Sequence, residues 1–168
     1  MSTTKSETPQ ARLPQELRDS TSFLLKRLGH AAKERALDVF EATGLTPYHY
    51  AVLLALAEDS HETQGAIADA LGYDRGQLVG LLDELEERGL VERRRDPADR
   101  RRQLVSATSA GQKELTRLRA LSRKLDDELF GPLEVEQRRQ LHELLVLLAE
   151  NHLPAFGGQK LGSGAKSS

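Results

Sequence analysis

Apolar residues recur at helical spacing over most of the chain. Over positions 15–42, leucines, alanines and Val39 follow one another at steps of three, four or seven, which predicts a single long helix with Pro14 in its first turn. The same spacing of leucines predicts two further long helices over 109–129 and 134–151. The two ends of the chain therefore contribute long helices, and the remaining elements of the fold must lie between them, over about residues 43–108.

Three shorter helices are expected between the long ones, because each begins with a capping residue. Thr46 precedes Pro47 at the start of the first, Thr63 begins the second, and Asp74 begins the third. Glycine closes the second and third helices. These helices are expected to run from Pro47 to about Asp59, from Thr63 to Gly72, and from Asp74 to Gly89.

A β-hairpin is expected directly after the third short helix. Residues 90–94 and 103–107 are suited to strands, and the polar turn Arg95–Arg102 with Pro97 near its tip joins them. The predicted fold class is mainly α with a small β-hairpin.

The order of short helix, glycine-containing turn, helix and hairpin is typical of a winged helix-turn-helix. In that motif the second helix enters the DNA major groove and reads base edges. A leucine stripe at 78, 81, 82 and 85 is expected to be buried, so the start of this helix faces outward. The candidate DNA-binding residues here are Arg75, Gly76 and Gln77, with Thr63 and Gln64 at the start of the preceding helix.

Gly76 and Gly80 are unusual, because each glycine inside a helix costs about 1 kcal/mol relative to alanine. We interpret them as allowing the helix backbone to approach DNA closely. The alternative is that they allow a neighbouring helix to pack there.

The hairpin is strongly basic, although the chain as a whole carries a net charge of −2. Residues 88–102 contain seven arginines and three acids, a net charge of +4, so the remainder of the chain carries −6. A local basic patch can dock on phosphates whatever the net charge of the molecule. Taken alone the turn would be interpreted as a solvated charged loop, but next to a helix-turn-helix it is typical of a DNA-binding wing. The candidate wing contacts are Arg95, Asp99, Arg100 and Arg101, with Asp99 placed to pair with Arg101.

Taken together, these segments resemble the multiple antibiotic resistance regulator (MarR) family of bacterial transcriptional regulators over residues 14–152. The wing string Asp96–Arg101, followed by Leu104, Val105 and Thr108, is the most specific part of the resemblance. The other matching segments are Leu45–Pro47, Gln64–Leu71, Asp74-Arg75 and Leu85–Val91. Members often have Ser or Thr where Gly76 and Gln77 stand, and a basic residue where Gly80 stands, so the resemblance does not extend to base preference.

The resemblance implies a homodimer that binds double-stranded DNA as a ligand-responsive repressor. Its long terminal helices would form the dimer, its two winged regions would read a pseudo-palindromic operator, and Arg101 would enter the minor groove with Asp99 as its supporting acid. The expected organisation is a disordered lead over 1–13, an N-terminal dimerisation helix over 14–45, the winged helix-turn-helix over 46–107, C-terminal dimerisation helices over 108–152, and a disordered tail over 153–168.

The family's effectors are often small phenolic or other aromatic molecules, bound between the dimer helices and the winged region. The candidate ligand residues are His30, Tyr48, His49 and Tyr50, and each is weighed against an ordinary packing or surface role. A thiol-oxidation signal is excluded because the chain has no cysteine, and a urate pocket is disfavoured because it has no tryptophan. The five histidines lack metal-ligand spacing, so neither a metal nor a cofactor is expected.

Other classes of function fit the sequence less well. No phosphate loop, nucleophile elbow or pair of catalytic carboxylates occurs, so an enzyme is not expected. The longest apolar runs, at 51–57 and 144–149, are far short of the roughly 20 residues of a membrane span, and a cytoplasmic protein is expected. A constitutive or architectural DNA-binding protein without an effector stays open as the alternative, as does a protein-interaction module on the same fold.

Overall fold

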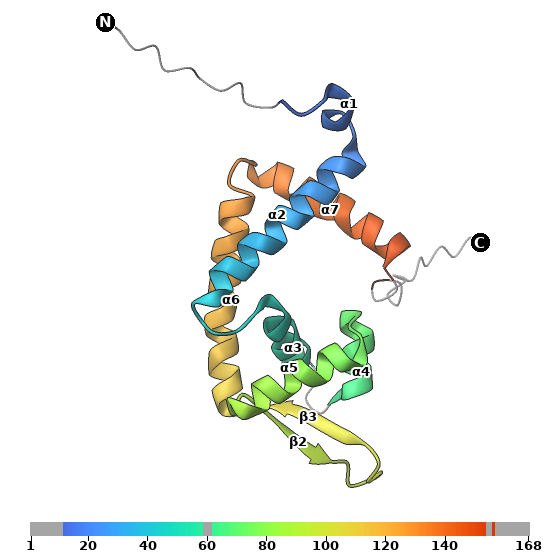
Figure 1. The fold of residues 1–168 in the computed structure, drawn as a ribbon, viewed down its shortest axis with the longest axis vertical. Helices are drawn as coiled ribbons and strands as arrows, with labels where there is room; N and C mark the ends of the chain where they lie inside the picture. The colour runs from blue at the N-terminus through green and yellow to red at the C-terminus, as the bar shows by residue number, and fades with distance from the viewer. Residues whose placement is uncertain (1–11, 59–61, 154–155, 157–168) are drawn as a thin grey trace, which may run out of the picture. The chain divides into compact units, whose positions relative to one another are not determined.

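The computed structural model describes residues 12–58, 62–153 and 156. The chain divides into two compact parts, residues 1–35 and 36–168, so α2 begins in the first and ends in the second (Figure 1). The elements are α1 (Gln15–Arg18), α2 (Thr21–Glu41), α3 (Pro47–Glu58), β1 (Glu62–Thr63), α4 (Gln64–Leu71), α5 (Arg75–Glu87), β2 (Val91–Arg95), β3 (Gln103–Ala107), α6 (Ser109–Leu129) and α7 (Val135–His152). The prediction of a mainly helical winged fold is confirmed. Disordered ends were expected over 1–13 and 153–168, and of these residues 1–11, 154–155 and 157–168 lie outside the described residues.

The first part corrects the prediction of one unbroken helix over 15–42. The helix is interrupted after Arg18, because Ser20 acts as a new capping residue: its Oγ accepts a hydrogen bond from the backbone N–H of Phe23 at 3.3 Å. Side-chain hydrogen bonds of this kind compete with a continuous helix. The apolar stripe on the first part of α2 remains exposed, with Leu24 and Leu28 among its members.

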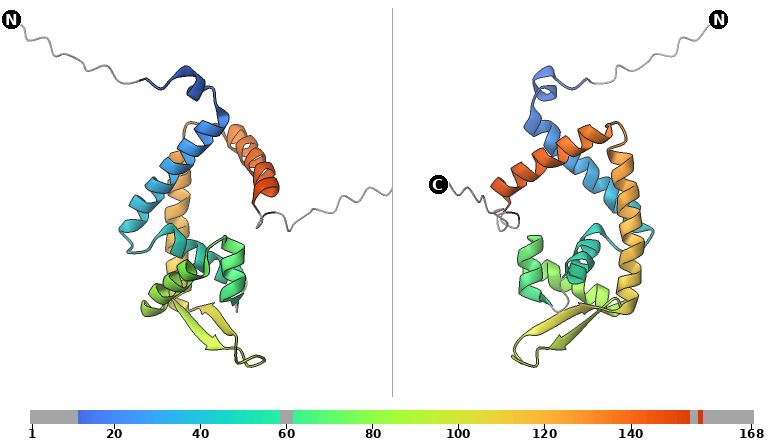
Figure 2. Two further views of the ribbon diagram at one scale, coloured as in Figure 1. Left: turned by 45° about the vertical axis from the view of Figure 1, so that its right-hand side comes forward. Right: turned by 180° about the vertical axis from the view of Figure 1, so that it is seen from behind.

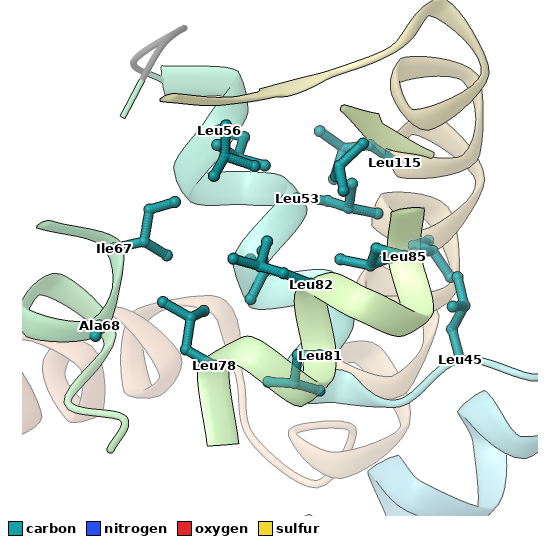
Figure 3. Close-up of a cluster of buried hydrophobic side chains, with 14 of the residues drawn as sticks. Leu45, Leu53, Leu56, Ile67, Ala68, Leu78, Leu81, Leu82, Leu85 and Leu115 are labelled. Carbon is teal, nitrogen blue, oxygen red and sulfur yellow. The ribbon is translucent and has the colours of Figure 1, made fainter. Parts of the chain in front are cut away.

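The core of the second part forms where α5 packs against α3. Leu82 and Leu85 of α5 are fully buried, as are Val52 and Leu53 of α3. Figure 3 shows the labelled leucines of both helices pointing toward one another, with Ile67 of α4 and Leu115 of α6 closing the sides of the cluster. The leucine stripe predicted for α5 is therefore confirmed. It fixes which face of this helix points outward.

A three-stranded antiparallel sheet in the order β1-β3-β2 lies beside these helices. The hairpin of β2 and β3 pairs Val91 with Ala107 and Arg95 with Gln103, one residue later in β2 than predicted. Figures 1 and 2 show its tip projecting beyond the helices. The short β1 pairs Thr63 with Leu104 and was not predicted from the sequence, since two residues show no periodicity.

The base of the hairpin is joined to α6 by a close backbone contact at Gly111. Thr108 donates its backbone N–H to Leu90 O at 3.0 Å and its hydroxyl to Gly89 O at 2.6 Å, while its Oγ1 accepts from Gly111 N at 3.1 Å. A Cβ atom at Gly111 would lie 2.0 Å from Leu90 O. Only glycine permits this approach without a backbone movement.

Helices α6 and α7 carry apolar faces that the described chain does not cover. Leu118 of α6 is fully buried, but Leu129 is exposed, and α7 has no buried residue at all. Leu144, Leu147 and Leu148 of α7 are about half exposed. Within the part of the chain that the structure describes, no helix is long and apolar enough to cross a membrane.

Replacing Gly111 with alanine tests the close contact with Leu90. Alanine has a helix propensity about 1 kcal/mol better than glycine, but overpacking a filled site costs about 1–3 kcal/mol, and the 2.0 Å contact places this site at the severe end. We expect the free energy of unfolding, measured by urea denaturation, to fall by at least about 1 kcal/mol.

The matched control is Gly80→Ala in α5, where a Cβ would meet nothing within 4 Å. That variant should be neutral or more stable by up to about 1 kcal/mol. Equal effects of the two substitutions would contradict the packing argument.

Candidate nucleic-acid interface

The helix-turn-helix is held by side-chain caps at both of its helices. Thr63 Oγ1 accepts from Ala66 N at 3.2 Å at the start of α4, and Asp74 Oδ1 accepts from Gln77 N at 2.8 Å at the start of α5. Between them Gly72 takes a left-handed conformation with φ of 66°, which ends α4 and turns the chain toward α5. All three capping assignments were predicted from the sequence and are confirmed.

The exposed face of the first two turns of α5 contains two glycines and therefore has few side-chain atoms. Arg75, Gly76, Gln77 and Gly80 are exposed, as predicted. No atom would lie within 4 Å of a Cβ at Gly80, and at Gly76 the only neighbour is the carboxylate of Asp74 at 3.2 Å. The alternative that these glycines pack against a neighbouring helix is therefore wrong for the described chain, and the bare backbone remains open on this side.

The wing turn is organised by two aspartates that bind backbone. Asp96 Oδ1 accepts from Ala98 N at 2.8 Å, and Asp99 Oδ1 accepts from Arg101 N at 3.0 Å. The same Asp99 oxygen lies 3.9 Å from Arg101 Nε, so the predicted pairing is confirmed as a loose ion pair. The Arg101 side chain is 96% exposed. Asp99 thus fixes the backbone of Arg101 while the guanidinium extends into solvent.

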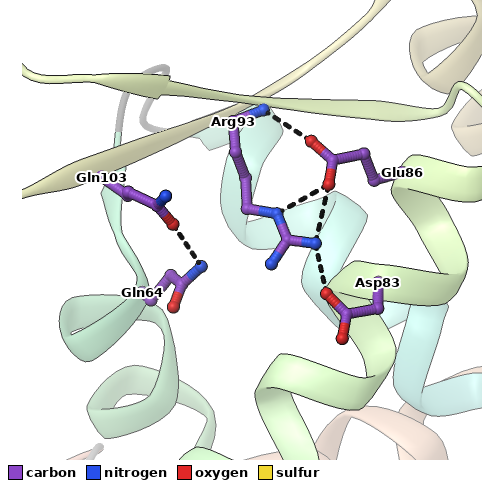
Figure 4. Close-up of polar contacts among 5 residues, drawn as sticks. All are labelled: Gln64, Asp83, Glu86, Arg93 and Gln103. Carbon is purple, nitrogen blue, oxygen red and sulfur yellow. Dashed lines mark hydrogen bonds and ion pairs between the residues drawn. The ribbon is translucent and has the colours of Figure 1, made fainter.

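Arg93 connects the hairpin to α5 (Figure 4). Its Nε donates to Glu86 Oε2 at 2.9 Å, its backbone N–H donates to Glu86 Oε1 at 3.2 Å, and its NH2 group also contacts Asp83. The side chain is only 16% exposed, and the hydrogen bonds that it donates to Asp83 and Glu86 raise the pKa of the guanidinium. Because one arginine bridges two carboxylates one turn apart, it fixes the angle of β2 against α5.

The start of α4 is joined to the same hairpin. Thr63 pairs with Leu104 through β1, and Gln64 Nε2 donates to Gln103 Oε1 at 3.4 Å, as Figure 4 shows. The candidate DNA-binding residues Thr63 and Gln64 therefore lie beside the end of β3 that follows the wing turn. The start of α4, all of α5 and the hairpin are held together in one unit.

The pairing of charges reduces the basic patch to the tip of the wing. Arg93 is occupied by two acids, and Arg94 NH2 lies 3.0 Å from Glu92 Oε2. No ion pair joins Arg95, Arg100 or Arg102 to any other residue of the described chain, and all three are exposed. The positive charge available to a ligand is thus concentrated at the end of the hairpin.

The candidate ligand residues Tyr48 and Tyr50 make their contacts with different parts of the chain. Tyr48 makes an edge contact with Tyr73 at a ring separation of 5.8 Å, whereas Tyr50 lies 5.7 Å from Phe40. Both tyrosines are half-buried, and His30 is exposed on the first part of α2. The contacts of Tyr48 and Tyr50 fit the packing alternative, and an effector role for the four residues stays a prediction.

His49 is buried between α3 and α5. The backbone N–H of Thr46 donates to His49 Nδ1 at 3.1 Å, so this nitrogen is an acceptor and the proton of the neutral ring resides on Nε2. Nε2 lies 3.1 Å from Glu84 Oε2, a close electrostatic contact that lacks the geometry of a hydrogen bond. Burial lowers the pKa of His49; the charge of Glu84 opposes this effect, and that of Arg88 adds to it. His49 therefore joins the start of α3 to α5 as a neutral side chain.

A hollow of about 440 Å³ lies at the end of α2 and the following loop. Asp38, Glu41 and Thr46 supply its polar lining, and Leu37, Gly44 and Leu45 the rest. None of the four candidate ligand residues lines it. The described residues contain no group of three or more histidine and acidic side chains that could hold a metal ion.

Sequence reasoning missed the structural role of Arg93 and counted it only toward the basic charge. A signal was present in the strand alternation, since Arg93 is two residues beyond the buried Val91 and so shares its inward face. It also missed Val79, the one apolar residue of α5 outside the buried stripe that remains exposed.

Comparison with known proteins identifies the family. The family model described as MarR family matches residues 43–102. The transcriptional regulator HosA of Escherichia coli O111:H- is 34% identical over 105 residues, which cover 62% of this chain and 78% of that protein. The chain belongs to the MarR family.

Solved structures agree with this assignment to the MarR family. The transcriptional repressor CouR bound to a 23-mer DNA duplex is 33% identical, with a TM-score of 0.76, over 83% of this chain and 99% of that one. CouR from Rhodococcus jostii RHA1 bound to p-coumaroyl-CoA is 32% identical, with a TM-score of 0.72, over 84% and 97% of the two chains. This MarR-family chain is a DNA-binding transcriptional regulator with a winged-helix fold, as the sequence predicted.

The neutral state of His49 predicts a pH-dependent stability. In the unfolded chain the histidine binds a proton near pH 6.5, whereas in the folded chain its pKa is lowered. The unfolded state therefore binds more protons as the pH falls below about 7, and the free energy of unfolding must decrease, by at most about 1.4 kcal/mol per pH unit for this one group.

Urea denaturation at pH 7 and pH 5 measures this effect, with His49→Gln as the control, because the glutamine oxygen can accept from Thr46 N–H but does not titrate. We expect a smaller loss of stability on acidification in the variant than in the wild type. Parallel losses in the two proteins would show that His49 does not contribute.

Proposed function

We propose that this protein is a homodimeric repressor that occludes a promoter by binding a pseudo-palindromic operator. Each protomer would insert the start of α5 into a major groove and the tip of its wing into an adjacent minor groove. The observation that carries the proposal is the combination on one unit of an open, capped α5 start and a wing whose unpaired arginines lie at its tip. The relative whose structure contains a DNA duplex is itself described as a repressor, which supports the sign of regulation.

The proposed contacts fall into two groups. Arg75 and Gln77 reach base edges from α5, where Gly76 lets the backbone approach, and Thr63 and Gln64 contact the adjoining backbone phosphates. Arg101 enters the minor groove, positioned by Asp99, while Arg95 and Arg100 bind phosphates beside it. This activity requires binding and no catalysis, and its place is the cytoplasm, where a bacterial cell holds its DNA.

The proposed dimer is supported by apolar faces that the single chain leaves uncovered. Leu24 and Leu28 in the first part, and Leu144 and Leu148 in the second, are between 42% and 61% exposed. Exposed leucines at helical spacing over several turns are far more than the scattered apolar residues of an ordinary surface. The faces thus favour the two long helical segments as the dimer contacts, which matches the predicted organisation over 14–45 and 108–152.

We propose further that a small aromatic effector releases the DNA. The support is the relative whose structure contains p-coumaroyl-CoA, an aromatic acyl thioester. His30, Tyr48, His49 and Tyr50 stay the candidate contacts, although the contacts of Tyr48 and Tyr50 within the chain also fit a packing role. The alternative is a constitutive DNA-binding protein, and it would show the same operator affinity with and without every aromatic acid tested.

Removing the wing arginine tests DNA binding directly. We expect Arg101→Ala to weaken binding to the intergenic DNA upstream of its own gene by about ten-fold or more, and to lower the slope of log affinity against log salt by about one for each wing. Fluorescence anisotropy over a salt series measures both quantities.

The matched control is Arg117→Ala, which removes one charge from an exposed arginine of α6. It should leave the salt slope unchanged. Equal effects of the two variants would reduce the role of Arg101 to net charge, and no binding by the wild type at low salt would overturn the proposal.

A charge on α7 tests the dimer. We expect Leu148→Glu to raise the dimer dissociation constant by about a hundred-fold or more, because the interface would bury an unpaired carboxylate. Sedimentation equilibrium measures this constant, and Glu150→Ala on the same helix should leave it unchanged. A wild-type protein that sediments as a monomer at micromolar concentration would contradict the dimer.

A further inference from the structure

Val79 is an apolar side chain on the outward face of the recognition helix. It is 40% exposed, and no other exposed residue of α5 has an apolar side chain. The core does not need it, because Leu78, Leu82 and Leu85 already fill the contact with α3. A lone exposed valine is ordinary on a protein surface, so its significance depends on what surrounds it.

Val79 is flanked on α5 by two glycines, which leave the helix backbone exposed beside it. Gly76 precedes it by one helical turn and Gly80 follows it, and neither has a side chain. A Cβ at Gly80 would meet no atom within 4 Å, so the open space beside Val79 is real and is not filled by another part of the described chain. A flat partner surface can therefore reach the valine methyl groups without meeting longer side chains on that side.

The charge along α5 restricts which turns can enter a groove. Asp83, Glu84, Glu86 and Glu87 are all exposed on the last turns of the helix. Arg93 pairs with Asp83 and Glu86, but Glu87 remains to repel phosphates. Only the first two turns, which contain Val79, can approach DNA closely.

We propose that Val79 reads the C5-methyl group of a thymine in each half-site of the operator. This inference rests on the proposed function. In the major groove the thymine methyl is the one apolar group in the pattern that the base pairs display, and it is recognised by contact with an apolar group of the protein. An exposed valine between two glycines matches that group in size, polarity and accessibility.

The position of the thymine follows from the geometry of the helix. Val79 is four residues beyond Arg75, about 6 Å along the axis at 1.5 Å per residue, which is about two base-pair steps of 3.4 Å. Arginine in the major groove pairs most often with guanine. The half-site should therefore contain the critical thymine within about two base pairs of the base that Arg75 contacts.

Replacing thymine with uracil removes only the methyl group and tests the inference. A high-affinity duplex is first selected by the wild-type protein from a random pool, and each thymine is then replaced by deoxyuridine in both half-sites at once. Loss of one methyl contact should weaken wild-type binding about four-fold per half-site, or about fifteen-fold in all. The affinity is measured by fluorescence anisotropy.

Two variants give the comparison its specificity. Val79→Ala should bind the thymine duplex more weakly and should bind the thymine and uracil duplexes equally. Val135→Ala, the same change at an exposed valine of α7, should keep the full thymine preference. The thermal unfolding midpoint of Val79→Ala is also measured. A midpoint close to that of the wild type shows that weaker binding by the variant is not caused by unfolding.

The outcomes separate this inference from the proposed function. A uracil penalty that is present in the wild type and lost in Val79→Ala supports the thymine contact. A selected duplex in which no uracil substitution matters, or a penalty that persists in Val79→Ala, overturns the contact while leaving DNA binding intact. Failure to select any duplex would instead overturn the proposed function.

Discussion

The burial of one leucine stripe on α5 determines the rest of the winged part. Leu78, Leu82 and Leu85 can be removed from water only by facing α3, and this fixes the rotation of α5 about its own axis. The opposite face is then exposed by necessity, whatever residues occupy it. This face carries glycines, a valine and, at the start of the helix, Arg75. The packing of the core and the character of the proposed DNA-reading surface are therefore set by the same constraint.

The arginines that form one basic segment in the sequence differ in the structure, because some are paired with acids and others are not. Arg93 is drawn inward by Asp83 and Glu86 and joins β2 to α5, while the arginines at the tip keep their charge for an external partner. The acids of the last turns of α5 thus have two effects. They hold β2 against α5, and in the proposed complex they confine the approach of DNA to the start of the helix, because uncompensated carboxylates oppose phosphate.

Much of the fold could be predicted because its signals are local. The helical periods, the caps at Thr63 and Asp74, and the strand-turn-strand pattern each depend on residues close together in the chain. The features that could not be predicted depend on competition between local hydrogen bonds or on contacts between residues far apart in the chain. The break before α2 depends on the side-chain cap of Ser20, which competes with a continuous helix. The strand β1 exists only because β3 is beside it, and the role of Arg93 required the register of β2 against α5. The DNA contacts stay predictions, because they form between this chain and a second molecule.

The three attachments of the wing have a consequence for the thermodynamics of recognition. β1 and Gln64 join the hairpin to α4, Arg93 joins it to α5, and the contact at Gly111 joins its base to α6. The conformational entropy of these elements is therefore lost when the chain folds and not when a ligand arrives. Only the few side chains at the tip, such as Arg101, remain to be ordered on association. The proposed DNA-reading surface is therefore preorganised, and a larger share of each contact that it would form with DNA is available as affinity.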